Sequence, residues 1–213
     1  MKKAVICFTR VPKAGCTKTR LMGLLTGEQC ADLHWAFLRD LAEVYQKLDA
    51  DLFVCHTPDP EWESLKPIFP GAKFFPQTGE GLGARMDNAL NRVLEMEYDA
   101  VVLTGADLPA MTLHHLESGF DALNRGDVTL GPTSDGGYYL VGVKASAPYL
   151  FENQTYGGGS VYECTVAAAR RAGRTVEAAL ACDDVDTPAD LEALKLASSS
   201  HTAAYLRQIG VIK

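Results

Sequence analysis

The chain has 213 residues, of which 47% are hydrophobic and 22% are charged, so it can bury a core as a single domain over residues 1–213 and is not expected to be disordered. The formal net charge of −7 argues against binding to nucleic acid or to an anionic membrane surface, because such proteins present a basic face. The six cysteines form no C-x-x-C pair, which argues against a zinc site, and no apolar stretch approaches the about 18 residues that a membrane helix needs. The apolar run near Met1 is too short for a signal peptide, so we expect a cytoplasmic protein.

Short continuous apolar runs recur along the chain. Runs of this kind are typical of strands that are covered on both faces of a sheet. They occupy residues 4–8, 52–55 and 100–103, and further strand patterns lie at residues 73–75, 128–130 and 138–143.

Segments with apolar residues at helical spacing separate these runs. They predict helices over residues 28–48, 61–66, 82–94, 112–125, 161–172, 188–197 and 202–209. Strands that alternate with helices favour an open, mainly parallel sheet with helices on both faces. We therefore expect a three-layer α/β/α fold.

The loop after the first strand is a candidate phosphate site, because ligands of open parallel sheets bind beyond the carboxyl ends of the strands. Hydroxyl residues and Gly15 in this loop leave backbone N–H groups accessible, and cations with such groups suit a phosphate chain. A solvated basic loop is the alternative. Pro12 and Thr17 stand where a P-loop needs glycine, so a P-loop kinase is not expected. The cations concentrated in this loop are Arg10, Lys13, Lys18 and Arg20.

Asp107 follows the strand at residues 100–103, with Gly105 before it and Pro109 after it. A carboxylate at a strand end can bind Mg²⁺, which takes one or two carboxylates together with substrate phosphates. The structural alternatives are a helix N-cap or a turn aspartate.

Three carboxylates crowd residues 183–186, and like charges this close repel one another unless a cation or a helix cap relieves them. A cap of the following helix by Asp186 or Thr187 would relieve them without any ligand. The glycines of residues 131–138 let a ligand approach the backbone, although Asp-Gly is also a hairpin turn signal. Three further glycines enter a predicted helix within residues 77–85.

Taken in order, these segments resemble the GT-A type nucleotide-diphospho-sugar transferases. The closest resemblance is to the small bacterial transferase family described as associated with radical-SAM or selenium domains. The chain is also similar to the guanylyltransferases of cofactor biosynthesis. The matching stretches are residues 8–21, 77–86, 105–109, 131–142 and 184–191, within a resemblance that spans about residues 2 to 195.

The resemblance implies a GT-A fold and a role for each segment. Asp107 would bind Mg²⁺ or Mn²⁺, with Asp186 as the second ligand or as a carboxylate near the acceptor, and together with Lys18 they would be the catalytic residues. The metal and the cations would neutralise charge on the phosphates while an oxygen nucleophile attacks. The residues that would bind the nucleotide are Arg10, Gly15, Lys18, Arg20, Gln77, Gly81, Gly83 and Arg85. The residues that would border the sugar or acceptor pocket are Asp135, Gly136, Gly137 and Tyr138.

The resemblance leaves the reaction open. Many GT-A glycosyltransferases carry Asp-x-Asp at the metal, whereas Gly105 stands two positions before Asp107 here. A single aspartate is more like the nucleotidyltransferases, which attack an α-phosphate and release pyrophosphate. We predict transfer of a sugar from a nucleotide-diphospho-sugar to a small acceptor, with nucleotidyl transfer from a triphosphate to a phosphorylated acceptor as the alternative. A non-catalytic nucleotide-binding module is a third hypothesis, and the acidic surface permits a homodimer.

Overall fold

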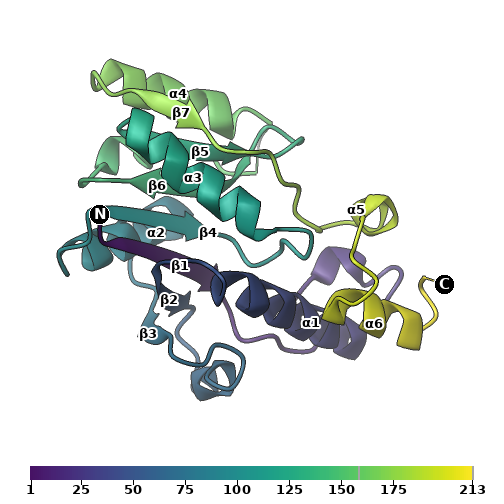
Figure 1. The fold of residues 1–213 in the computed structure, drawn as a ribbon. Helices are drawn as coiled ribbons and strands as arrows, with labels where there is room; N and C mark the ends of the chain where they lie inside the picture. Colours follow the sequence, from purple (N-terminus) through teal and green to yellow (C-terminus); the bar gives the residue numbers. More distant parts are fainter. Residues whose placement is uncertain (158, 213) are drawn as a thin grey trace.

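The computed structural model describes residues 1–157 and 159–212, which form a central sheet between two layers of helices (Figure 1). The strands lie in the order β3-β2-β1-β4-β6-β5-β7. Their bounds are β1 Lys3–Thr9, β2 Asp51–His56, β3 Lys73–Pro76, β4 Ala100–Thr104, β5 Val128–Pro132, β6 Tyr138–Val143 and β7 Val176–Ala178.

The sheet is mainly parallel, as the alternation of strands and helices predicts. Strand β1 pairs in parallel with β2 and β4, β2 pairs in parallel with β3, and β5 pairs in parallel with β7. Strand β6 is antiparallel to both β4 and β5, so the glycine-rich residues 131–137 join two neighbouring antiparallel strands. Strand β7 was not predicted, because its three residues are too few to show a periodic pattern.

The helices cover both faces of the sheet. The structure gives α1 Gly27–Tyr45, α2 Gly81–Leu94, α3 Leu113–Arg125, α4 Val161–Arg171, α5 Pro188–Ala193 and α6 His201–Gln208, with 3₁₀ turns at Thr19–Leu21, Trp62–Leu65 and Pro148–Leu150. Helix α5 ends at Ala193 instead of residue 197. Leu194 adopts an extended backbone there, and both Leu194 and Leu196 pack into an apolar cluster near the C-terminus.

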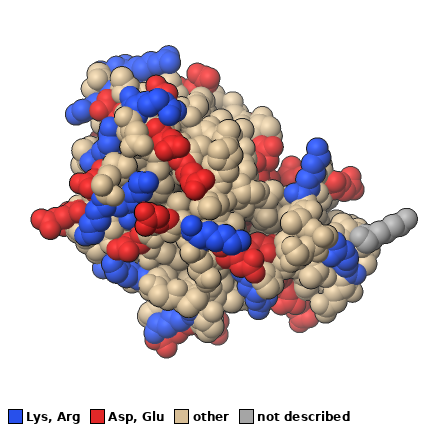
Figure 2. Space-filling view, viewed as in Figure 1, with Lys and Arg blue, Asp and Glu red and all other residues tan. Residues whose placement is uncertain are grey.

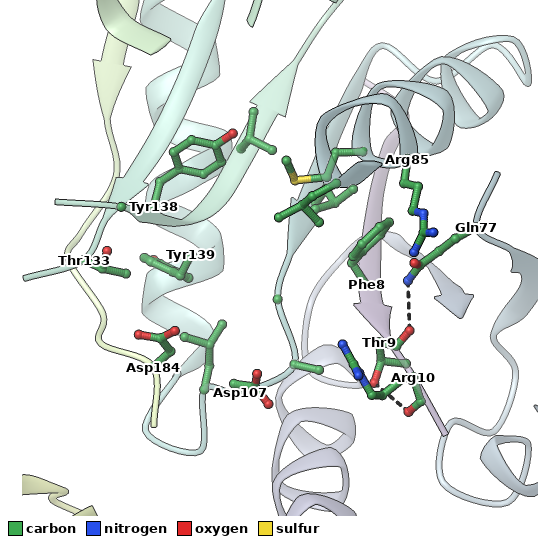
Figure 3. Close-up of a pocket in the computed structure, with 18 of the residues that line it drawn as sticks. Phe8, Thr9, Arg10, Gln77, Arg85, Asp107, Thr133, Tyr138, Tyr139 and Asp184 are labelled. Carbon is green, nitrogen blue, oxygen red and sulfur yellow. Dashed lines mark hydrogen bonds between the residues drawn. The ribbon is translucent and has the colours of Figure 1, made fainter. Parts of the chain in front are cut away.

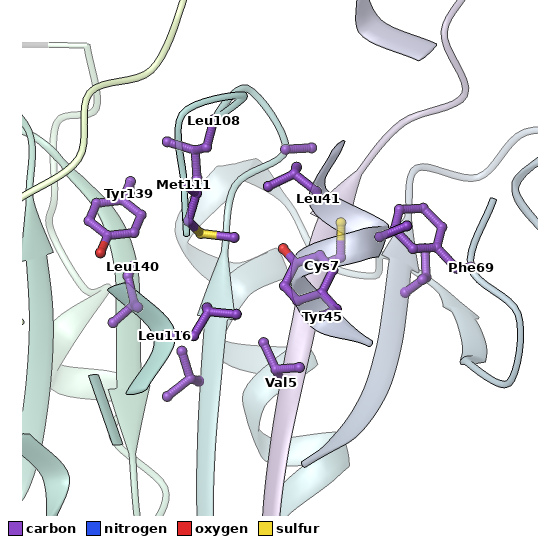
Figure 4. Close-up of a cluster of buried hydrophobic side chains, with 14 of the residues drawn as sticks. Val5, Cys7, Leu41, Tyr45, Phe69, Leu108, Met111, Leu116, Tyr139 and Leu140 are labelled. Atoms are coloured by element: carbon purple, nitrogen blue, oxygen red, sulfur yellow. The ribbon is translucent and has the colours of Figure 1, made fainter. Parts of the chain in front are cut away.

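Alternation along the strands divides the core between the two faces. Val5 and Cys7 of β1 pack on the face covered by α1 and α3, together with Tyr45 and Leu116 (Figure 4). Residues from β1, α2 and α4 form the cluster on the opposite face. Tyr45 and Thr104 share a 2.6 Å hydrogen bond between their hydroxyl groups, which ties α1 to the carboxyl end of β4. This hydrogen bond therefore fixes, from the core side of the sheet, the end of β4 that precedes Asp107.

A separate apolar group, here called the C-terminal cluster, connects α1 with α5, α6 and the segment before α5. Its buried members are Leu21, Leu25, Cys30, Leu33, Phe37, Val185, Leu191 and Leu206. This cluster brings the end of the basic loop, at Leu21, beside the acidic segment at Val185.

Basic and acidic side chains are interspersed on the face shown in Figure 2 and are not gathered by sign. None of the helices in the described ranges is long and apolar enough to cross a membrane.

Candidate active site

Two adjoining cavities lie beyond the carboxyl ends of β1, β2 and β4. The larger has a volume of about 350 Å³ and the smaller about 250 Å³. Arg10, His34 and Asp107 line both cavities, so the two form one continuous site. The larger cavity alone is within the size range of small-molecule sites.

The larger cavity has two chemically different ends (Figure 3). Phe8, Gln77 and Arg85 lie on one side, which we call the Arg85 end. Tyr138 lies on the other side with further polar side chains from the β5–β6 region and the acidic segment, which we call the Tyr138 end. Asp107 lies between the two ends. A ligand that fills the cavity therefore passes this carboxylate.

Gln77 fixes the Arg85 end to the sheet. Its side-chain Nε2 donates hydrogen bonds to Thr9 O at 2.9 Å and Cys55 O at 3.2 Å, and its side chain is buried. It therefore holds the carboxyl ends of β1 and β2 in register beside the cavity. Arg85 Nε donates to Gly79 O at 3.2 Å, which orients the guanidinium group.

The basic loop forms the wall of the smaller cavity. Its fold is held by hydrogen bonds from Lys13 N to Thr17 Oγ1 at 3.0 Å and from Cys16 N to Lys13 O at 3.1 Å. Lys13 itself points elsewhere, since its Nζ lies 2.9 Å from Asp59 and 3.0 Å from Glu61. The cations that line the smaller cavity are Arg10, Lys18 and Arg20.

Lys18 joins the basic loop to both candidate metal ligands. Its Nζ lies 2.7 Å from Asp107 Oδ1 and 3.0 Å from Asp186 Oδ1, and it donates a 2.6 Å hydrogen bond to Val185 O. Only 3% of the Lys18 side chain is exposed, against 39% for Asp107. The second oxygen of Asp186 accepts from Arg20 at 3.1 Å. The two carboxylates therefore share the ammonium group of Lys18, and Asp186 is also paired with Arg20.

The acidic segment is held in place by its backbone. Val185 N donates to Asp107 O at 2.9 Å. Asp190 Oδ2 accepts from Asp186 N at 3.0 Å and Thr187 N at 2.7 Å, and Thr187 is the N-cap of α5. Thr187 and Asp190 thus cap the helix, so the side chain of Asp186 is available to face Lys18.

Burial and charge act against each other at the centre of the site. Burial raises the pKa of Asp107, but the combined effect of Lys18, His34 and Arg10 exceeds it and holds the pKa below the usual value. Burial lowers the pKa of His34 to about 4, so this imidazole is neutral at physiological pH. Burial, together with the charge of Asp186, raises the pKa of Asp184 to about 6.

The oxygens of Asp107 and Asp186 could supply part of the ligand set of a divalent cation. They already contact one cationic atom from two sides, and Mg²⁺ is commonly held by one or two carboxylates with substrate phosphates and water. Within residues 1–157 and 159–212, no group of three or more His, Cys, Asp or Glu side chains could hold a metal ion. The donor set therefore suits a metal that arrives with phosphate ligands, and not a metal enclosed by protein ligands alone.

Several glycines expected in the site lie outside both cavities. Gly81 and Gly83 line a different cavity beside Tyr156, and a Cβ on Gly83 would lie 2.8 Å from the Tyr156 hydroxyl. Gly15 and Gly136 have φ of +73° and +85°, so they set the shape of their loops. Gly137 lines the larger cavity, as do Asp135 and Tyr138.

The structure adds side chains that the sequence analysis did not select. His34, Thr133, Tyr139 and Asp184 all line the larger cavity. The acidic run at residues 183–186 drew attention to Asp184 without separating it from its neighbours. His34 gave no signal, since it lies among apolar residues of a predicted helix and reads as a core position.

Comparison with known proteins supports the fold. The chain is 31% identical to a "putative nucleotide-diphospho-sugar transferase" from Desulfovibrio desulfuricans G20, with a TM-score of 0.87 over 98% of this chain and 95% of that one. It is 25% identical to a 2-phospho-L-lactate guanylyltransferase of Methanocaldococcus vulcanius, over 97% of this chain and 92% of the relative. A 4-diphosphocytidyl-2C-methyl-D-erythritol synthase of Anaerococcus prevotii has the same fold, with a TM-score of 0.60 at 10% identity over 96% of each chain.

The expected α/β fold is thus confirmed as that of the nucleotide-diphospho-sugar transferases and cytidylyltransferases. A family model described as "Uncharacterized protein conserved in bacteria" (DUF2064) matches residues 40–158, and the chain belongs to this bacterial family.

Proposed function

We propose that the protein is a nucleotidyltransferase, which transfers a nucleoside monophosphate from a triphosphate to a small phosphorylated acceptor and releases pyrophosphate. The observation that carries the proposal is the pair Asp107 and Asp186 around one cationic atom, between a basic cavity and a larger two-ended cavity. The guanylyltransferase relatives favour this reaction over sugar transfer and make GTP the first triphosphate to test.

Each part of the site has a task in this reaction. Arg10, Lys18 and Arg20 would bind the triphosphate in the smaller cavity, while the Arg85 end of the larger cavity would receive the nucleoside. Asp107 and Asp186 would hold Mg²⁺ or Mn²⁺, which would supply positive charge at the phosphates when bound. The acceptor would enter from the Tyr138 end.

The reaction balances without a proton transfer from the acceptor. A phosphate oxygen of the acceptor attacks the α-phosphorus, the bond to the β-phosphate oxygen breaks, and pyrophosphate leaves. The attacking oxygen is already anionic, so no general base is needed. Arg10 lines both cavities and would reduce the repulsion between the acceptor phosphate and the triphosphate.

Sugar transfer, our first prediction from the sequence, stays as a second candidate because of the Tyr138 end. Thr133, Asp135 and Asp184 line this end, and hydroxyl and carboxylate groups can hydrogen-bond the hydroxyls of a sugar. The similarity to the Desulfovibrio protein also favours it. In that reaction the nucleoside diphosphate leaves and the sugar is transferred.

The position of the label distinguishes the two reactions. The protein would be incubated with Mg²⁺ and GTP labelled at the α- or γ-phosphate, with phosphorylated hydroxy acids, including 2-phospho-L-lactate, as acceptors. The proposal predicts that α-label enters an organic product and γ-label appears in pyrophosphate, with both lost in Asp107→Asn. A parallel incubation would replace GTP by a GDP-sugar labelled in the sugar. Transfer of this labelled sugar, without release of pyrophosphate from any triphosphate, would replace the proposal by the second candidate. The absence of both reactions with all acceptors would favour a binding module.

A further inference from the structure

We propose that Lys18 is a built-in counter-ion: its ammonium group occupies the cation position between Asp107 and Asp186 until a metal–nucleotide complex displaces it. This inference rests on the proposed function and deepens it, because it states how the site admits its metal.

The contacts of Lys18 match the requirements of a bound cation. An ammonium group has three N–H donors, and three oxygens surround this one, from Asp107 at 2.7 Å, Val185 at 2.6 Å and Asp186 at 3.0 Å. Lys18 therefore donates hydrogen bonds to Val185 O and Asp186 Oδ1, and it forms an ion pair with Asp107 Oδ1. Two of the three oxygens belong to the carboxylates that would bind a divalent metal.

Burial places the ammonium group beneath the carboxylates. The Lys18 side chain is 3% exposed, whereas the side chains of Asp107 and Asp186 are 39% and 38% exposed. A metal ion that enters from the cavity reaches the carboxylates but meets the positive charge of Lys18 between them. Charges a few ångströms apart interact strongly at a partly buried site, so this charge opposes metal binding.

The backbone at Lys18 directs its side chain to this position. Lys18 has φ of 51° and ψ of 41°, a left-handed conformation that costs free energy in a residue with a side chain. Its neighbour in the loop, Lys13, contacts Asp59 and Glu61 outside the cavities. The loop therefore aims one particular lysine at the two carboxylates.

A bound triphosphate would give Lys18 another partner. Lys18 also lines the smaller cavity, where the phosphates are proposed to bind. If the ammonium group moves to the phosphates, the two carboxylates become free for the metal. Metal and nucleotide would then bind cooperatively, and by linkage each would strengthen the binding of the other by the same factor.

The test is a titration with Mn²⁺ alone, followed by the electron paramagnetic resonance signal of free Mn²⁺. It uses the full chain as wild type, Lys18→Met and Lys18→Gln, with Lys13→Met as the matched control from the same loop. We expect both Lys18 variants to bind one Mn²⁺ per chain at least about tenfold more tightly than wild type. Lys13→Met should behave like wild type. The thermal midpoint of the Lys18 variants should rise with Mn²⁺ alone, whereas that of wild type should rise only with Mn²⁺ and GTP together.

Two results would overturn the inference. The first is equal Mn²⁺ affinity in wild type and in both Lys18 variants. The second is no Mn²⁺ binding by the folded Lys18 variants while wild type shows a Mn²⁺-dependent response to GTP. Failure of the proposed function looks different, because the label assay would then show no transfer even if Mn²⁺ affinities follow the expected order.

Discussion

Among the polar side chains, that of Asp40 in α1 should make one of the largest contributions to the stability of the protein. Its buried carboxylate accepts hydrogen bonds from the first turn of α6, from His201 N at 2.7 Å and Thr202 N at 2.9 Å, and also from the Thr202 hydroxyl. Asp40→Ala would leave these donors without their partner, and Thr202 is fully buried. A buried donor that loses a charged partner costs on the order of 1–3 kcal/mol.

The expected loss in the free energy of unfolding is about 3 kcal/mol, because the donors share one carboxylate and their costs do not add fully. For a chain of this size that corresponds to a fall in thermal midpoint of about 6–12 °C. Glu43→Ala is the matched control, because Glu43 also joins α1 to α6, through His201 at 3.0 Å, but is 60% exposed. An exposed pair of this kind contributes about 0–1 kcal/mol.

Differential scanning calorimetry of the two variants and wild type would measure the difference. Asp40→Ala should melt well below Glu43→Ala. Equal midpoints for the two variants would refute the claim that this carboxylate anchors α6, and with it the C-terminal cluster beside the site.

Three further predictions concern the site and the stability of the fold. At saturating Mn²⁺, Lys18→Ala should weaken GTP binding at least about tenfold in calorimetric titration, and Lys13→Ala should change it by less than about twofold; equal losses would mean that the phosphates lie elsewhere. Gly136→Ala should lower the thermal midpoint, because the residue has φ of +85° and a Cβ would lie 2.1 Å from Gly159 O; an unchanged midpoint would contradict that packing. The hydrogen bond from Tyr98 chiefly lowers the pKa of Asp51, so its stabilisation is present above the unfolded pKa of about 4 and disappears as the pH falls through the lower folded value. Asp51→Asn should therefore lose less stability at pH 2 than at pH 7 in urea unfolding, and an equal loss at both would count against this assignment.

Local sequence patterns were sufficient for most of the fold. The buried strands gave continuous apolar runs, and helices such as α2 gave a clear period, since both depend on which side chains face the sheet. The end of α5 was less predictable, because nothing local distinguishes Leu194 in a helix from Leu194 packed into a distant cluster. The same is true of β7, which is defined by its pairing with β5.

The residues of the candidate site also fall into those that local sequence patterns could predict and those that they could not. Asp107 and the basic loop could be selected because they directly follow predicted strands. The contact between Lys18 and Asp186 joins residues 168 positions apart, so no local pattern contains it. It depends on the C-terminal cluster and on the hydrogen bond between Val185 and Asp107. His34 was missed for a related reason, since only the assembled fold places that helix residue beside the cavity.

The role of Asp107 is tested most directly by the thermal midpoint with Mn²⁺ and GTP, compared among wild type, Asp107→Asn and Asp121→Asn, an exposed control carboxylate on α3. A ligand at 100 times its dissociation constant stabilises by about 2.7 kcal/mol, which is on the order of 5–10 °C here. This increase is expected for wild type and Asp121→Asn, and its loss is expected in Asp107→Asn, with the fold intact. An equal increase in all three proteins would show that Asp107 does not hold the metal–nucleotide complex.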